Sequence, residues 1–364
     1  MAITEAQIQD RLKQLIDPTT GKDYVSSKEI KKIQVNEAGD IAVEVVLGYP
    51  ANSQLEAVRS QVRDALASLP DGGKVEVDVG FKIVSHAVQG GVPRVPGVRN
   101  IIAVASAKGG VGKSTVAVNL ALALAAEGAS VGILDADIYG PSQPTMLGLQ
   151  GQRPTSADGK TLDPMIAHGV RAMSIGFLID MEQPMVWRGP MVTQALEQLL
   201  RDTQWKDLDY LVVDMPPGTG DIQLTLSQRV PLTGAVIVTT PQDIALLDAK
   251  KGIKMFEKVG VPILGIVENM STHICTNCGY EEHIFGEGGG QKMAHDYGVT
   301  VLGSLPLDIR IREQADSGKP TVVADPESPA ARTYREIARR VAVRIAEKAQ
   351  DFSAAFPKIV IKST

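Results

Sequence analysis

The stretch AKGGVGKST, residues 107–115, decides the fold of this 364-residue chain. It follows the apolar run 101–105 and opens a segment with apolar residues at helical spacing. A glycine-rich turn between a strand and a helix directs backbone N–H groups at an anion, and the helix N-terminus adds partial positive charge. We expect a nucleotide's phosphates to bind to the loop residues, with Lys113 on the β- and γ-phosphates and the Ser114 hydroxyl on Mg²⁺. These residues are Gly109, Gly110, Val111, Gly112, Lys113, Ser114 and Thr115.

Further short apolar runs alternate with helical stretches downstream of this loop, at residues 131–134, 211–213, 235–238 and 263–267. Strands that are apolar on both faces and separated by helices predict a mostly parallel sheet covered on both faces. The predicted fold class is therefore an α/β P-loop NTPase, preceded by a small α+β domain. A basic, periodic segment from Tyr334 to Lys348 is expected to be a helix that packs on this sheet.

Polar residues follow three of the predicted strands. Asp135 and Asp137 come at the end of the second strand, Asp214 ends the strand YLVVD, and Asn269 follows the strand 263–267. The carboxyl ends of parallel strands share one edge of the sheet, where ligands bind in such folds. Asp214 has the Walker B position, from which a carboxylate holds Mg²⁺ through water. The loop 215–221, MPPGTGD, suits a switch that senses the γ-phosphate.

The chain has only two cysteines, Cys275 and Cys278, in a Cys-x-x-Cys-Gly turn. Four interpretations remain open: a redox dithiol, a zinc site completed by His273 or His283, two unliganded thiols, and a shared iron–sulfur cluster. A cluster normally requires four thiolates, and two chains related by a twofold axis supply four. We favour a [4Fe–4S] cluster held by Cys275 and Cys278 of two chains.

A second lysine, Lys108, precedes the glycines, and it cannot easily reach its own nucleotide from that side of the loop. The sequence KGGVGKST resembles the deviant P-loop ATPases of the MinD, ParA and nitrogenase iron-protein class. The resemblance implies that Lys108 reaches the ATP of a partner subunit and that Asp137 orients water. It also implies that Asp135 lies near Mg²⁺ and that Asn269 reads adenine. Slow, dimer-dependent ATP hydrolysis is expected, with Lys108, Lys113 and Asp137 as the catalytic residues.

Several longer motifs narrow the resemblance: DADIYGPSQPTMLG, VWRGPM at 186–191, PPGTGD, and ENMS…CTNCG followed by FGEGGG. Together they resemble the Mrp/ApbC family of iron–sulfur cluster carrier ATPases. The resemblance implies ATP, Mg²⁺ and a [4Fe–4S] cluster as cofactors. As partners it implies a homodimer, a cluster donor and recipient apoproteins. The small first domain resembles a domain of cluster-assembly factors, although it contains no cysteine.

The chain divides into four expected parts: a small α+β domain at 1–86, a Gly/Pro linker at 87–98, the ATPase domain at 99–350 and a tail at 351–364. In the first part, helical spacing predicts a helix from Ile8 to Ile16, ended by Asp17-Pro18, and a second helix over 55–69. Alternating apolar residues predict two strands, over 41–47 and 75–83.

The composition argues against several functions. The chain has 37 Lys and Arg against 42 Asp and Glu, a net charge of −5, so binding to nucleic acid is not expected. No apolar run of 18 residues and no secretory signal is visible, which predicts a cytoplasmic protein without stable membrane association. Two rival functions are a MinD-like positioning ATPase and an ATP-driven redox protein of the nitrogenase iron-protein type.

Overall fold

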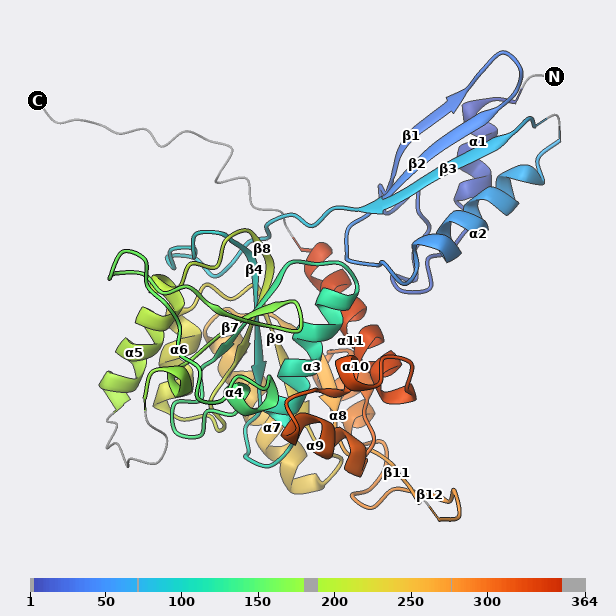
Figure 1. Cartoon of the computed structure of the whole chain (residues 1–364). Helices are drawn as coiled ribbons and strands as arrows, with labels where there is room; N and C mark the ends of the chain where they lie inside the picture. Colours follow the sequence, from blue (N-terminus) through green and yellow to red (C-terminus); the bar gives the residue numbers. More distant parts are fainter. Residues whose placement is uncertain (1–2, 71, 180–188, 276, 349–364) are drawn as a thin grey trace, which may run out of the picture.

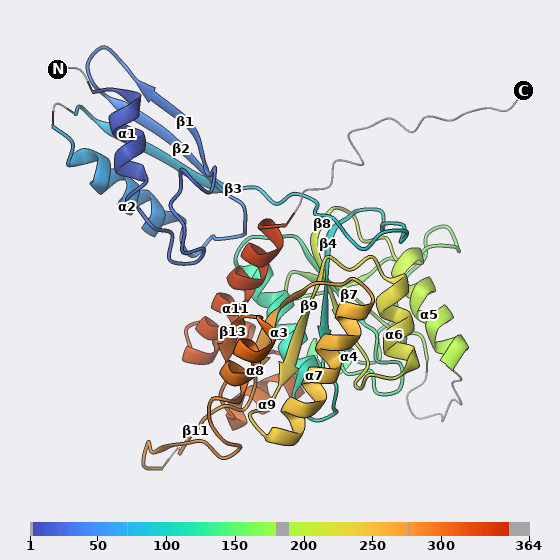
Figure 2. The ribbon, with the colours of Figure 1, turned by 180° about the vertical axis from the view of Figure 1, so that it is seen from behind.

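The computed structural model describes residues 3–70, 72–179, 189–275 and 277–348. The expected tail at 351–364 and the motif residues Val186, Trp187 and Arg188 lie outside these ranges. Figure 1 shows a small N-terminal domain beside a larger α/β domain, and Figure 2 shows the same arrangement from behind.

The N-terminal domain is a three-stranded sheet with two helices packed against it (Figure 1). Strand β1 pairs antiparallel with β2, and β2 pairs parallel with β3. Alternate residues of β2 are buried, as its apolar alternation predicts. The elements are α1 (Glu5–Leu12), β1 (Ile30–Val35), β2 (Ile41–Leu47), α2 (Leu55–Ala67) and β3 (Val75–Phe81).

The expectation that the first helix runs to Ile16 was wrong. Helix α1 ends at Leu12, and Ile16 instead forms an isolated antiparallel bridge with Asp23. Asp17 is buried and anchors a turn, because its carboxylate accepts hydrogen bonds from the Thr19 backbone N–H and the Tyr49 hydroxyl. The Asp17-Pro18 pair therefore begins a turn and does not cap a helix.

The larger domain is built on an eight-stranded sheet with the order β13-β10-β9-β4-β8-β5-β7-β6. All neighbouring pairs are parallel except β6 with β7. Central strands such as β9 are buried at every residue, which confirms the expectation of a sheet covered on both faces. The strands are β4 (Val98–Ala105), β5 (Val131–Asp135), β6 (Met165–Ala167), β7 (Val170–Ser174), β8 (Leu208–Asp214), β9 (Gly234–Thr239), β10 (Ile263–Glu268) and β13 (Val301–Ser304).

Helices cover both faces of this sheet (Figures 1 and 2). Helices α3 and α11 pack together on one face, and α7 packs against β9 and β10 on the other, with α6 and α8 beside it. The expected packing of the basic C-terminal helix is confirmed by α11. The helices are α3 (Lys113–Ala126), α4 (Gln143–Met146), the 3₁₀ helix η1 (Ile175–Phe177), α5 (Gly189–Asp202), α6 (Asp221–Arg229), α7 (Asp243–Lys258), α8 (Gly289–Tyr297), α9 (Ile309–Asp316), α10 (Thr321–Ala324) and α11 (Pro329–Ala346). In the described part of the chain, no helix combines the length and apolarity that crossing a membrane requires.

The two domains meet at the C-terminal end of α3. The carboxylate of Glu127 is fully buried there and accepts hydrogen bonds from the backbone N–H and hydroxyl of Ser53, at 3.0 and 2.7 Å. Arg339 of α11 completes the junction with an ion pair of 2.6 Å to Glu127. The N-terminal domain therefore contacts the end of α3 that is remote from the glycine-rich loop.

Candidate functional site

The glycine-rich loop connects β4 to α3 in the conformation that its sequence predicts. Gly110 and Gly112 have φ values of 82° and 81°, in the left-handed region that favours glycine. Gly112 also leaves no space for a side chain, since a Cβ there would lie 2.2 Å from Nδ2 of Asn269. Lys113 and Ser114 begin the helix directly after Gly112, so the loop ends at a helix N-terminus, where an anion binds favourably.

Lys113 is the buried cation at the centre of this site. Its Nζ contacts the Asp214 carboxylate at the end of β8 and lies 3.1 Å from the Ser114 hydroxyl. Both charged side chains are buried, Lys113 at 6% and Asp214 at 0% exposure. The structure thus brings together three residues that the sequence assigned separately to phosphate and Mg²⁺.

Gln143 is a member of the site that the sequence analysis missed. It is buried in α4, and its Nε2 donates to Asp214 Oδ2 at 2.9 Å and to the Ser114 carbonyl at 3.2 Å. Its backbone N–H donates to Asp135 Oδ2 at 3.0 Å, so one residue contacts both carboxylates. The only signal in the sequence was its place inside the motif DADIYGPSQPTMLG.

Asp135 and Asp137 lie at the same edge of the sheet as the loop. Asp135 is fully buried and also accepts hydrogen bonds from the Ser174 hydroxyl at 3.2 Å and from the Asp137 backbone N–H at 3.2 Å. Burial, and next the charge of Asp214, raises the pKa of Asp135. Burial likewise raises the pKa of half-buried Asp137.

These groups fit a bound Mg²⁺. Asp135 and Asp214 are both fully buried and both accept from Gln143, and a divalent cation beside them would relieve the repulsion between the two carboxylates. Oxygen atoms are the ligands that Mg²⁺ prefers, and Ser114, Asp135 and Asp214 supply them.

Lys108 lies outside this buried centre. Its side chain is exposed, while its carbonyl accepts a hydrogen bond from the Ser106 hydroxyl at 2.9 Å. The loop 215–221 contacts the same segment, because the Gly218 N–H donates to the Ser106 carbonyl at 2.9 Å. The predicted switch loop and the start of the phosphate loop are therefore joined at Ser106.

Asn269 joins the end of β10 to the phosphate loop. Its Nδ2 donates to the Val111 carbonyl at 2.9 Å, and the side chain is buried. The predicted reading of adenine would therefore fall to its Oδ1. Met270, the next residue, has a φ of 57°, so the chain turns sharply there towards the cysteines.

Cys275 and Cys278 lie on a short hairpin after this turn. Strand β11 (His273–Ile274) pairs antiparallel with β12 (Glu281–Glu282), and Gly279 closes the turn with a φ of 72°. Figure 1 shows the hairpin projecting from the α/β domain at the end remote from the N-terminal domain, and Figure 2 agrees. The hairpin base is held by the Thr272 carbonyl, which accepts from the Leu307 N–H at 2.7 Å.

The two thiols are free and accessible, with Cys275 half-buried and Cys278 exposed. The backbone N–H groups of Cys278 and Asn277, and next the Cys278 thiol, lower the pKa of Cys275. A thiolate is the form that ligates metals. Each nearby histidine uses one ring nitrogen in a hydrogen bond to the backbone. His273 Nδ1 bonds to the Leu307 carbonyl, and His283 Nδ1 bonds to the Ser271 carbonyl. Within the described ranges, no three His, Cys, Asp or Glu side chains converge as a metal site.

This combination of fold and loop defines a P-loop NTPase. The sequence model of the NUBPL iron-transfer P-loop NTPase family matches residues 97–342. The sequence model of the iron–sulfur cluster assembly protein family matches residues 5–79. The chain therefore belongs to the NUBPL iron-transfer P-loop NTPase family, with an iron–sulfur cluster assembly domain at its N-terminus. This confirms the resemblance that the sequence motifs indicated.

Individual relatives agree with this assignment. An iron–sulfur cluster carrier protein of Haemophilus influenzae is 54% identical over 93% of this chain and 91% of its own length. A nucleotide-binding protein of Archaeoglobus fulgidus, solved with ADP, is 38% identical with a TM-score of 0.57, over 65% of this chain and 91% of that one. The cell division ATPase MinD of Pyrococcus furiosus shares the fold. It is 23% identical with a TM-score of 0.51, over 66% of this chain and 98% of its own.

Proposed function

We propose that this protein is an ATP-dependent iron–sulfur cluster carrier, which holds a [4Fe–4S] cluster between two copies of the chain and delivers it to apoproteins. The observation that carries the proposal is the accessible Cys275 and Cys278 pair on a hairpin that begins four residues after Asn269, a contact of the phosphate loop. A nucleotide site and a thiol pair are thereby joined through one short segment.

The nucleotide chemistry follows from the buried centre. The backbone N–H groups of residues 109–115 bind the phosphates of ATP, and Lys113 exchanges its contact with Asp214 for the β- and γ-phosphates. Ser114, Asp135 and Asp214 would hold Mg²⁺, which when bound would neutralise part of the phosphate charge. Asp137 orients the water that attacks the γ-phosphorus, and ADP leaves. Lys108 is exposed beside the loop and acts on the ATP of the partner subunit, which makes slow hydrolysis dependent on the dimer.

The thiol count requires two chains. A [4Fe–4S] cluster takes four thiolates, and each chain supplies Cys275 and Cys278. Zinc bound within one chain is disfavoured, because in the described residues no three His, Cys, Asp or Glu side chains converge around the thiols. An exposed cluster on a hairpin is suited to transfer, whereas an electron carrier benefits from a protected one. The thiols must stay reduced, which fits the cytoplasm.

Nucleotide binding at the phosphate loop alters the position of the two thiols through Asn269. Closure of the loop around ATP moves Val111, and the hydrogen bond from Asn269 transmits that movement to the segment leading to Cys275. The switch loop 215–221 responds at the same time through Ser106.

Transfer to an apoprotein tests the proposal. The protein is reconstituted anaerobically with iron and sulfide, then mixed with an apo-dehydratase that needs a [4Fe–4S] cluster for activity. Recovery of dehydratase activity in the presence of an iron chelator supports direct transfer. Recovery that the chelator abolishes, or that a Cys275→Ser, Cys278→Ser variant equals, contradicts it.

A further inference from the structure

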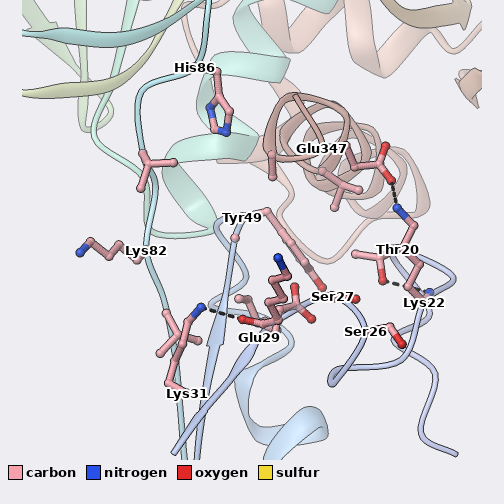
Figure 3. A pocket seen from close by; sticks show the side chains of 17 residues that line it. Thr20, Lys22, Ser26, Ser27, Glu29, Lys31, Tyr49, Lys82, His86 and Glu347 are labelled. Atoms are coloured by element: carbon pink, nitrogen blue, oxygen red, sulfur yellow. Dashed lines mark hydrogen bonds and ion pairs between the residues drawn. The ribbon is translucent and has the colours of Figure 1, made fainter. Parts of the chain in front are cut away.

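A cavity lies at the joint between the two domains, and neither the nucleotide chemistry nor the thiols use it. Its volume is about 470 Å³. The N-terminal domain supplies most of its wall, the connection to β4 supplies Val84 and His86, and the end of α11 supplies Val343, Ala346 and Glu347. Figure 3 shows Lys22 of the N-terminal domain in contact with Glu347, an ion pair of 2.7 Å that spans the joint.

The wall of this cavity is positively charged. Four lysines and two glutamates line it, so cationic side chains outnumber carboxyl groups. Burial lowers the pKa of His86, so this histidine adds no charge near neutral pH. The four lysines are Lys22, Lys28, Lys31 and Lys82. Lys22 forms an ion pair with Glu347, and Lys31 Nζ donates to the Lys28 carbonyl at 2.6 Å.

One carboxyl group in the cavity wall has an oxygen atom that accepts no hydrogen bond. Glu29 is 6% exposed, and its Oε2 has no hydrogen-bond partner in the structure. The neighbouring acid Asp17 is satisfied, since the Tyr49 hydroxyl donates to it at 2.7 Å. Buried polar atoms nearly always have a partner, so Oε2 marks a position where a donor is expected.

We propose that this cavity binds a small organic anion that also carries a hydrogen-bond donor, such as a hydroxy- or amino-carboxylate. Lys28, Lys31 and Lys82 bind its anionic groups, and Glu29 Oε2 accepts its hydroxyl or ammonium proton. The volume is in the range of small-molecule sites and too small for a folded partner. Because Glu347 and His86 belong to the other side of the joint, the ligand bridges the two domains.

This ligand is distinct from the nucleotide. The phosphate loop follows the carboxyl end of β4, whereas the cavity is lined by the connection that enters the amino end of the same strand. Figure 1 shows the N-terminal domain at the end of the sheet remote from the hairpin β11–β12. The proposal therefore does not depend on the carrier function.

The test is isothermal titration calorimetry of the full chain with ADP and Mg²⁺ at saturation, so that the phosphate loop is filled. The probes are malate, succinate, which lacks the hydroxyl, and neutral glycerol. We expect malate to bind at least tenfold more tightly than succinate, and glycerol not to bind. Equal affinities for malate and succinate would contradict the role of Glu29, and failure of both anions to bind at millimolar concentration would overturn the site.

Two adjacent lysines provide matched variants that leave the core intact. Lys31 and Lys32 are neighbours on β1 and both are exposed, but only Lys31 lines the cavity. Lys31→Gln should weaken malate binding about tenfold, while Lys32→Gln should leave it unchanged. Equal effects of the two substitutions would show a general charge effect and overturn the proposed site.

Discussion

The side-chain amide of Asn269 donates a hydrogen bond of 2.9 Å to the carbonyl of Val111, across 158 residues of sequence. This contact ties the segment that leads to Cys275 and Cys278 to the loop expected to bind ATP. Both partners are buried, so the hydrogen bond is shielded from water. A change in the loop on nucleotide binding therefore has a direct route to the thiols.

Asn269→Ala should uncouple the two sites. The substitution leaves the buried Val111 carbonyl without this donor, which costs about 1–3 kcal/mol and loosens the loop. We expect nucleotide affinity to fall several-fold and the effect of ATP on the rate of cluster release to disappear, as measured by calorimetry and by absorbance. Asn36→Ala, in the N-terminal domain, is the control. An ATP effect of unchanged size in Asn269→Ala would contradict the coupling.

Substitutions of the two lysines of the loop should affect stability and hydrolysis differently. Lys113→Met removes the cation beside buried Asp214, so it should abolish hydrolysis and lower the free energy of unfolding of the protein without nucleotide by roughly 3 kcal/mol. Lys108→Met alters an exposed side chain and should leave stability within about 0.5 kcal/mol while reducing dimer-dependent hydrolysis. Steady-state ATPase assays and chemical unfolding measure both. Full activity of Lys108→Met would remove the proposed role of Lys108 in the partner's site.

The junction at Glu127 should control docking of the N-terminal domain. Glu127→Gln replaces the carboxylate that accepts two hydrogen bonds from Ser53 by a neutral amide, which weakens these contacts across the joint, so the domain should undock more readily. Hydrogen exchange at residues 52–54 should then accelerate while the strands of the large sheet stay protected. Glu257→Gln breaks only the exposed pair with Lys254 and should change nothing. Unchanged protection at residues 52–54 in Glu127→Gln would show that docking does not depend on this carboxylate.

Glu29 should make stability depend on pH. Burial, and next the charge of Asp17, raises the pKa of Glu29 from 4.5 to about 7. The folded chain thus binds this proton more tightly than the unfolded chain, so the Glu29 contribution to stability falls as pH rises from about 4.5 to about 7. Glu29→Gln should remove this decrease and gain roughly 1–3 kcal/mol relative to the wild type between pH 5 and pH 8, measured by urea unfolding. A parallel pH dependence in both proteins would contradict the assignment.

The sequence predicted the parts of the fold that depend on local pattern. Fully apolar strands such as β9 and the glycine-rich loop were expected, because burial on both faces and a phosphate-binding turn each leave a continuous signature. Strand β1 was missed, since its sequence IKKIQV is exposed or half-buried throughout and lacks that signature. Gln143 and Glu127 were missed for a different reason. Their roles depend on partners 71 and 212 residues away, which no local pattern reveals.

The most direct test of the central claim is native mass spectrometry after anaerobic reconstitution with iron and sulfide. The account predicts a dimer of the wild-type chain that carries one [4Fe–4S] cluster, and no cluster in Cys275→Ser or Cys278→Ser, both of which still bind ADP. A monomer that carries a complete cluster, or a dimer that holds only zinc at these thiols, would contradict the shared four-thiolate site.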